Sequence, residues 1–129
     1  MALGGQGAPL VPAFHNAVFS EPEQDVVVVN IGGIANLTFL PAKTGNNTQG
    51  ITGFDTGPGN ALLDDWHAKY HQERFDESGR WGASGTTNQS LLDALLKYEY
   101  FSRSAPKSAG REVFNLDWLN HYFSLVCQA

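Results

Sequence analysis

Cysteine is almost missing from this sequence, and clustered basic residues and long apolar runs are missing altogether. Cys127 is the only cysteine among 129 residues, so an internal disulfide framework is excluded and a reducing cytoplasm fits best. The 8 Lys and Arg residues are scattered and outnumbered by 13 Asp and Glu, which gives a net charge of -5. Nucleic acid and anionic membranes both require a basic patch, so we expect neither as a partner.

No stretch is long or apolar enough for a signal peptide or a membrane span. A chain of 129 residues can bury a modest core, which suits one small domain or one piece of a larger one. Glycine, in contrast, is plentiful, with 14 residues. Several of these glycines stand between apolar segments, and they form the most informative patterns of the sequence.

The first of these patterns predicts a strand hairpin. Four consecutive valines at 26–29 are too short a run for a buried helix and too β-branched to favour one, so they predict a strand covered on both faces. The apolar pattern breaks at Gly32 and Gly33 and resumes over residues 35–39. This break predicts a hairpin with a flexible glycine tip.

A second glycine-rich turn follows a third apolar piece at 51–54. We expect this turn to run from Asp55 to Asn60 and to feed a helix that begins near Ala61. The fixed φ of Pro58 and the capping oxygen of Asn60 suit such a helix start. Two strands thus deliver two glycine-rich turns.

Such turns can bind phosphate, because no Cβ blocks the approach to the backbone N–H groups and the helix start adds unpaired donors. The carboxylate of Asp55 would repel a bare phosphate, so in such a site it is a partner for a metal-bound water or a sugar hydroxyl. The combination indicates a magnesium nucleotide. Ordinary turn chemistry is the competing interpretation, and spacing alone favours it, since short glycine motifs often match by chance.

The second half of the sequence predicts helices joined by loops. The spacing of apolar residues predicts helices over 61–74 and 89–97, with an irregular connection at 75–88 that forms a lid or a plain loop. Residues 104–115 again have loop chemistry. Asn115 can cap a last helix, whose pattern is still running where the sequence stops, so the C-terminus looks cut.

Three histidines are candidates for chemistry. His15 lies in a short apolar segment and either faces a substrate or is merely packed and hydrogen-bonded, which is the commoner case. His67 and His71 have the four-residue spacing of helical metal ligands. No HExxH motif surrounds them, so we do not expect zinc.

Two further segments are candidates for substrate binding. Gly5, Gln6 and Gly7 can bring backbone donors and an amide to a polar ligand, although a flexible terminus is the simpler interpretation. Lys107 and Arg111 are cations near a glycine and can hold an anionic group. Two solvated surface charges explain them at least as well.

Taken together, five blocks resemble the successive blocks of the anhydro-N-acetylmuramic acid kinase family. They are GGQGAPLVPAFH at 4–15, VNIGGIANLT at 29–38, GFDTGPGNALLDDW at 53–66, GRWGASG at 79–85 and PKSAGREVFNLDWL at 106–119. Each block alone is weak evidence, but the five occur in order and cover nearly the whole chain.

The resemblance implies an α/β fold, namely a piece of an actin-like ATPase (ribonuclease H-like) domain in which an antiparallel strand meander is followed by helices. Residues 1–24 would be an inter-domain loop segment on the substrate side, and residues 25–129 part of the second of two domains that close over ATP. Full-length relatives are expected to phosphorylate 1,6-anhydro-N-acetylmuramic acid while water opens its anhydro bridge. The product is N-acetylmuramic acid 6-phosphate, formed during peptidoglycan recycling in the bacterial cytoplasm.

The resemblance also implies roles for individual residues, with ATP and Mg²⁺ as cofactors and Asp55 as the metal partner. The residues implied in nucleotide binding are Asn30, Gly32, Gly33, Asn36, Asp55, Gly57, Gly59 and Asn60. The residues expected on the sugar side are Gly5, Gln6, Gly7, His15, Lys107 and Arg111.

The chain departs from the family pattern in two respects. The family's catalytic aspartate, the general base, stands a few residues before the GGQG block and is expected before residue 1, so we assign no catalytic residue here. Ala109 replaces a usual threonine. We therefore expect an enzyme fragment that is inactive alone, because phosphoryl transfer depends on complete positioning. A non-catalytic nucleotide-binding or scaffold module of the same fold is the alternative, and dimerisation of the parent protein is left open.

Overall fold

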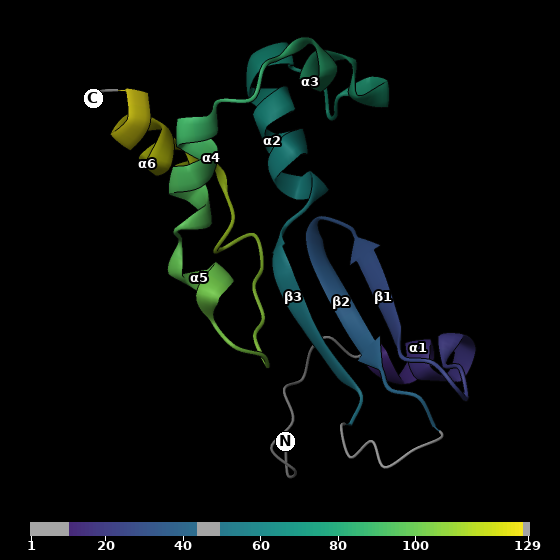
Figure 1. The fold of residues 1–129 in the computed structure, drawn as a ribbon. Coiled ribbons are helices and arrows are strands. Elements are labelled where there is room, and N and C mark those ends of the chain that lie inside the picture. Colours follow the sequence, from purple (N-terminus) through teal and green to yellow (C-terminus); the bar gives the residue numbers. More distant parts are fainter. Residues whose placement is uncertain (1–10, 44–49, 128–129) are drawn as a thin grey trace.

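The protein is built on a three-stranded antiparallel sheet followed by helices (Figure 1). The structure, a computed structural model, describes residues 11–43 and 50–127. Strands β1 (Val26–Ile31), β2 (Ile34–Leu40) and β3 (Thr52–Pro58) lie in the order β1-β2-β3. The predicted α/β class, with a strand meander before the helices, is therefore confirmed.

The predicted β1–β2 hairpin with its glycine tip is also confirmed. Val26 pairs with Leu40 at one end and Ile31 with Ala35 at the other, so the chain reverses through Gly32 and Gly33. Glycine suits this tip because the turn lies against another backbone segment, as described below.

Strand β3 is longer than predicted, because residues 55–58 belong to the strand and not to a turn. Ile34 pairs with Pro58 and Ala35 with Gly57, so β2 holds the whole segment in the sheet despite its glycines and proline. The register shifts between Ala35 and Asn36, which leaves Thr56 as the extra residue of a β-bulge. The Thr56 hydroxyl donates to the Ala35 carbonyl at 3.1 Å and so stabilises the bulge.

The prediction that residues 1–24 form a loop segment was wrong for part of this stretch, because Pro12–Phe19 form helix α1. Helix α1 packs across one face of the sheet against β2 and β1. Its His15 is buried, and His15 Nδ1 lies 2.9 Å from the hydroxyl of buried Thr38 on β2. The opposite face of β1 is open, with Val27 55% and Val29 62% exposed. The prediction that β1 is covered on both faces was therefore wrong, because helix α1 covers only one of them.

Within the described residues 59–127, five α-helices and a 3-10 turn follow the sheet, and α4 packs beside α6 (Figure 1). Their bounds are α2 Asn60–His71, η1 Glu77–Gly79, α3 Arg80–Ser84, α4 Gln89–Leu96, α5 Glu99–Ser102 and α6 Leu116–Cys127. No helix among residues 11–43 and 50–127 is long and apolar enough to cross a membrane.

The predictions for the second half of the chain need three corrections. Helix α2 ends at His71 and not near residue 74, because Gln72 has a left-handed φ of 57° and its N–H caps the helix on the Ala68 carbonyl. The connection at 75–88 contains η1 and α3 and is not irregular throughout. Helix α5 was not predicted. The predicted cap of α6 is confirmed, since Asn115 Oδ1 accepts from the Trp118 N–H at 2.9 Å.

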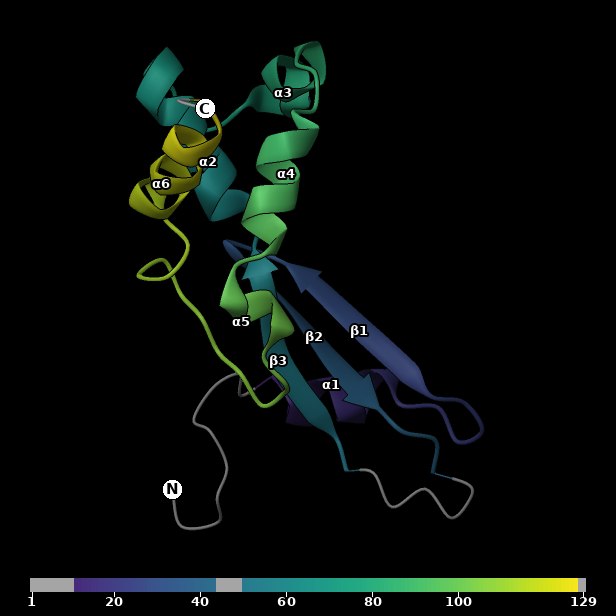
Figure 2. The same ribbon diagram turned by 60° about the vertical axis from the view of Figure 1, so that its left-hand side comes forward.

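Helix α5 and the segment that leads from it to α6, together called the α5–α6 segment, run along the outer edge of β3 (Figures 1 and 2). This segment carries the buried core residues Tyr100 and Phe114. The Asp55 N–H donates to the Lys107 carbonyl at 3.2 Å, and the buried Tyr100 hydroxyl donates to the Asp55 carbonyl at 2.8 Å. The Tyr100 ring packs edge-on against Phe114 at 5.2 Å between centroids. Burial and the nearby Asp55 charge raise the pKa of the Tyr100 phenol, which therefore remains a donor at neutral pH.

Removal of the Tyr100 hydroxyl tests this attachment of the α5–α6 segment. We expect Tyr100→Phe to lower the free energy of unfolding by about 1–2 kcal/mol, because a buried carbonyl loses its hydroxyl partner. Tyr122→Phe is the matched control, since the Tyr122 hydroxyl makes no hydrogen bond within the described part of the chain. Urea unfolding followed by circular dichroism measures both. Equal losses in the two variants would contradict the attachment.

Candidate functional site

The tip of the β1–β2 hairpin and the start of α2 lie side by side and are joined by three backbone hydrogen bonds. The Gly59 N–H donates to the Gly33 carbonyl at 3.0 Å, and the Asn60 N–H donates to the Gly32 carbonyl at 2.8 Å. The Ala61 N–H donates to the Gly33 carbonyl at 3.2 Å. We call this contact between the β1–β2 tip and the start of α2 the glycine junction. The start of α2 thus finds its hydrogen-bond acceptors in the hairpin.

The close approach at the glycine junction requires glycine at position 59. A Cβ on Gly59 would lie 2.3 Å from the Gly32 carbonyl oxygen and 3.2 Å from the Gly33 carbonyl oxygen. Backbone atoms cannot yield as a flexible side chain can, so any other residue would push the hairpin tip and the start of α2 apart. A Cβ on Gly57 would likewise meet the Phe101 ring at 2.8 Å. Both glycines therefore have a packing role, whatever they bind.

The glycine junction also determines which amides are available to a ligand. The N–H groups of Gly59, Asn60 and Ala61 are occupied by the hairpin carbonyls. The N–H groups of Gly32 and Gly33 have no hydrogen-bond partner within residues 11–43 and 50–127. The available backbone donors are therefore at the hairpin tip and not at the start of α2.

Asn60 is not the helix cap that its sequence context predicted. The N-cap is Gly59, and no side chain caps the helix. Asn60 is the first residue of α2 and is exposed. Its amide side chain therefore remains available beside the hairpin tip.

Three of the polar residues expected at the nucleotide lie in one row across the sheet. Asn30 pairs with Asn36 in the β1–β2 register, and Asn36 pairs with Asp55 in the β2–β3 register. Residues directly opposite one another share a face of the sheet. The row runs from exposed Asn30 to buried Asp55.

Asp55 is fixed by partners that sequence reasoning missed. Its Oδ2 accepts from the Ser108 hydroxyl at 2.8 Å and from the Ala109 N–H at 3.0 Å. Because the contact to residue 109 comes from the backbone, alanine makes it as well as threonine would. The interaction spans 53 positions between Ser108 and Asp55, so no local sequence pattern could have revealed it.

The described residues expected on the sugar side have separate partners in the fold. His15 is bonded to Thr38 under α1. The Lys107 ammonium donates to the Tyr100 carbonyl at 3.1 Å and lies 4.9 Å from the centre of the Tyr100 ring. Arg111 is exposed and lies 3.7 Å from Asp65. Gly5, Gln6 and Gly7 are outside the described residues.

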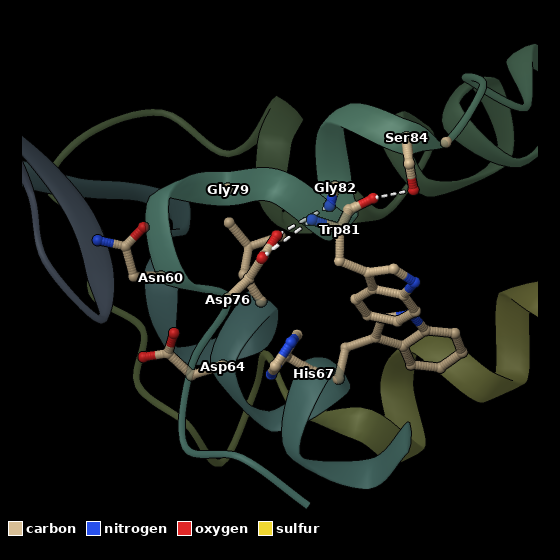
Figure 3. A pocket seen from close by; sticks show the side chains of 11 residues that line it. Asn60, Asp64, His67, Asp76, Gly79, Trp81, Gly82 and Ser84 are labelled. Atoms are coloured by element: carbon tan, nitrogen blue, oxygen red, sulfur yellow. Dashed lines mark hydrogen bonds between the residues drawn. The ribbon is translucent and has the colours of Figure 1, made fainter. Parts of the chain in front are cut away.

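A pocket of about 560 Å³ opens between α2 and the η1–α3 segment (Figure 3). Sequence reasoning did not find this pocket, although three of its polar residues occur at helical spacing. Its lining residues are Asn60, Leu63, Asp64, Trp66, His67, Asp76, Gly79, Trp81, Gly82, Ser84 and Gly85. Asn60 connects the pocket to the glycine junction.

Asp76 holds the α3 wall of this pocket. Its two carboxylate oxygens accept from the Trp81 N–H at 3.0 Å and the Gly82 N–H at 2.8 Å, as drawn in Figure 3. The hydrogen bond from Gly82, followed by that from Trp81, lowers the pKa of Asp76 below its ordinary value of 3.8. The carboxylate therefore stays charged and holds the start of α3 in place.

The histidine pair on α2 forms an aromatic stack. The His67 and His71 rings lie 4.7 Å apart at 16°, and the Trp81 ring lies edge-on to both. No group of three or more His, Cys, Asp or Glu side chains within residues 11–43 and 50–127 is arranged to hold a metal ion.

Comparison with known proteins gives consistent matches. The sequence model of the anhydro-N-acetylmuramic acid kinase family matches residues 1–128. The anhydro-N-acetylmuramic acid kinase of Shewanella halifaxensis is 55% identical over 124 residues, which are 96% of this chain and 32% of that protein. The enzyme of that name from Haemophilus influenzae is 57% identical over 126 residues, which are 98% of this chain and 32% of that protein. The chain thus spans about a third of the length of these relatives.

A substitution at Gly59 tests the glycine junction. We expect Gly59→Ala to lower the free energy of unfolding by about 1–3 kcal/mol, because the added methyl group clashes with backbone atoms. Gly50→Ala is the control, since a Cβ there has nothing within 4 Å. Its effect should stay within about 0.5 kcal/mol. Thermal or urea unfolding measures both, and a Gly59→Ala effect as small as the control would count against the clash.

A pH titration tests the anchoring of α3. Because the pKa of Asp76 is lower in the folded chain than in the unfolded one, its contribution to stability is present at neutral pH. This contribution is lost as the pH falls through the folded-state pKa. We expect the Trp81 and Gly82 amide resonances to titrate below pH 3.8 and to lose this transition in Asp76→Asn. A midpoint at or above 3.8 would refute the anchoring.

Proposed function

Because this chain belongs to the anhydro-N-acetylmuramic acid kinase family, we propose that it forms the nucleotide-binding side of a kinase that phosphorylates 1,6-anhydro-N-acetylmuramic acid. The reaction consumes ATP and water, opens the anhydro bridge and yields N-acetylmuramic acid 6-phosphate. The family is part of the actin-like ATPase superfamily, and membership in a kinase family implies the use of ATP. The single observation that carries the proposal is the glycine junction, which leaves two unpaired amides at the hairpin tip.

The phosphates are assigned to the tip of the β1–β2 hairpin. Gly32 and Gly33 offer adjacent N–H groups with no side chain in front of them, which is the arrangement that binds phosphate oxygens. Exposed Asn60 adds an amide beside them. Gly57 and Gly59 act indirectly, because they allow the packing that positions the tip.

Mg²⁺ fits this arrangement with Asp55 as the single protein carboxylate near the ion. Magnesium is commonly held by one or two carboxylates, waters and the phosphates of its nucleotide, so a full cage of protein ligands is not needed. Ser108 and Ala109 occupy Oδ2 of Asp55, so we assign Oδ1 to a metal-bound water. Asn30 and Asn36 extend this polar row and can orient waters around the ion.

We also propose roles for the residues expected on the sugar side. Arg111 is exposed and holds only a long contact to Asp65, so it is available for an anionic substituent. Lys107 and His15 are engaged within the fold and would position neighbouring segments. Gly5, Gln6 and Gly7 keep their expected role near the sugar.

We likewise propose residues 25–129 as part of the second of two closing domains, with residues 1–24 on the substrate side, in a cytoplasmic enzyme.

Catalysis by such a site depends on positioning. Phosphoryl transfer requires its reacting groups in line and the charge of the transferred group stabilised, and the protein supplies little covalent chemistry. ATP supplies the phosphoryl group. Within this chain the hairpin tip would hold the phosphate oxygens, and Asp55 would fix the hydration of the metal. The α5–α6 segment holds Asp55 rigid through Ser108 and Ala109.

Blocking the hairpin tip tests the proposal. A Cβ on Gly32 would meet only ordinary contacts, the nearest being Asn30 Nδ2 at 3.6 Å, so Gly32→Val should fold. We expect it to weaken Mg-ATP binding about tenfold or more, because one charge-assisted hydrogen bond is worth ~1.5–3 kcal/mol. Gly50→Val, in open space, should bind as the unaltered chain does.

Isothermal titration calorimetry with Mg-ATP measures all three proteins. Circular dichroism confirms that each variant is folded. The proposal fails if the unaltered chain does not bind Mg-ATP, or if Gly32→Val binds it with unchanged affinity.

A further inference from the structure

Residues 73–87, which contain η1 and α3, form a segment between two helix caps. Gln72, with its left-handed φ, ends α2 before the segment begins. Asn88 starts α4 after the segment, because its Oδ1 accepts from the Leu91 N–H at 3.0 Å. In both Figure 1 and Figure 2, α3 lies at the end of α2 farthest from the sheet. The two neighbouring helices are therefore terminated by residues outside the segment.

The segment makes its hydrogen bonds with itself. Asp76 accepts from the Trp81 N–H and the Gly82 N–H and so closes the segment into one piece (Figure 3). Within the part of the chain that the structure describes, no hydrogen bond or ion pair joins residues 73–87 to any other residue. Packing alone therefore holds the segment against α2.

This packing depends on one side chain. The Trp81 ring lies edge-on to His71 at 4.3 Å between centroids and to His67 at 5.4 Å. Phe75, the other aromatic residue of the segment, is 57% exposed and contacts no ring in the described part of the chain. Trp81 and Asp76 are the only residues of the segment that are not exposed. Asp76 serves the segment internally, so Trp81 is what attaches it to α2.

Space remains between the segment and α2. Gly79, Gly82 and Gly85 line the pocket of about 560 Å³ from the side of the segment. A Cβ on Gly79 would have nothing within 4 Å, and a Cβ on either of the other two would meet only atoms of the segment itself. The segment therefore has room to move relative to α2 across the pocket.

We propose that residues 73–87 are a lid over this pocket, with Trp81 as the latch that holds the lid on α2. A segment with few buried apolar contacts and exposed hydrogen bonds opens at a lower free energy than the whole chain unfolds. The hinges lie at the two ends of the lid, next to the helix caps. The lid controls entry to the pocket whichever molecule enters it, so this inference does not rest on the proposed function. Of the lid and the plain loop that the sequence allowed, the structure favours the lid.

The histidines of the chain report the opening of the lid. His67 contacts the latch and is 4% exposed, whereas His71 on the next turn of α2 is exposed and gives the rate of an unprotected ring. His15, which is 7% exposed and packed between α1 and β2, is the buried control. Diethyl pyrocarbonate modifies accessible imidazole rings, and mass spectrometry of peptides gives the rate at each histidine.

The unaltered chain is modified in a series of urea concentrations below the unfolding transition seen by circular dichroism. We expect His67 to become reactive at lower urea than His15, because the lid opens without the sheet. The lid is overturned if His67 becomes reactive no earlier than His15.

Two adjacent carboxylates within the lid provide matched variants. Asp76→Ala removes both internal hydrogen bonds, so the modification of His67 without urea should become about tenfold faster or more. Glu77 forms only an exposed ion pair with Arg80, and Glu77→Ala should change this rate by less than about twofold. Equal His67 rates in the two variants, or a matching rise at His15 in Asp76→Ala, would overturn the lid. The urea series on the unaltered chain decides the matter even if Asp76→Ala is unfolded.

Discussion

The structure depends on the contact between two backbones at the glycine junction. Three N–H groups at the start of α2 donate to the carbonyls of the β1–β2 tip, so the sheet itself satisfies donors that a helix otherwise leaves unpaired. This contact sets the direction in which α2 leaves β3. The Gly33 N–H belongs to the same planar trans peptide as the Gly32 carbonyl, so it points away from the Asn60 N–H that this carbonyl accepts. The same short loop thus gives its carbonyls to packing and leaves its N–H groups for the phosphates that we propose it binds.

The α5–α6 segment gives Asp55 its fixed position. Tyr100, Ser108 and Ala109 hold the carbonyl and the carboxylate of this residue from the outer edge of β3. Lys107 in turn caps the short helix α5 by donating to the Tyr100 carbonyl. For the role that we propose for Asp55, the orientation of a metal-bound water, such support matters because small displacements weaken positioning. The segment therefore connects the packing of the helices to the candidate site on the sheet.

Much of the fold followed from local sequence signals, and the rest depended on contacts distant in the chain. The glycine pair at 32–33, the helix from residue 89 and the Asn115 cap were predicted because each has a local cause. The extension of β3 to Pro58 was missed because β2 imposes it against local turn chemistry. The partners of Asp55 and the pocket around His67 were missed because they join residues that only the folded chain brings together. The site residues themselves remain predictions, supported by their geometry.

The open side of β1 has a practical consequence. Within the described residues β1 is an edge strand, and Val27, Val29 and Ile31 expose apolar side chains along it. An apolar edge strand that is free of lysine and proline is a template for pairing with another chain. Concentrated samples of the 129 residues are therefore prone to aggregation by intermolecular strand addition, and a single lysine placed on this edge is the simplest protection.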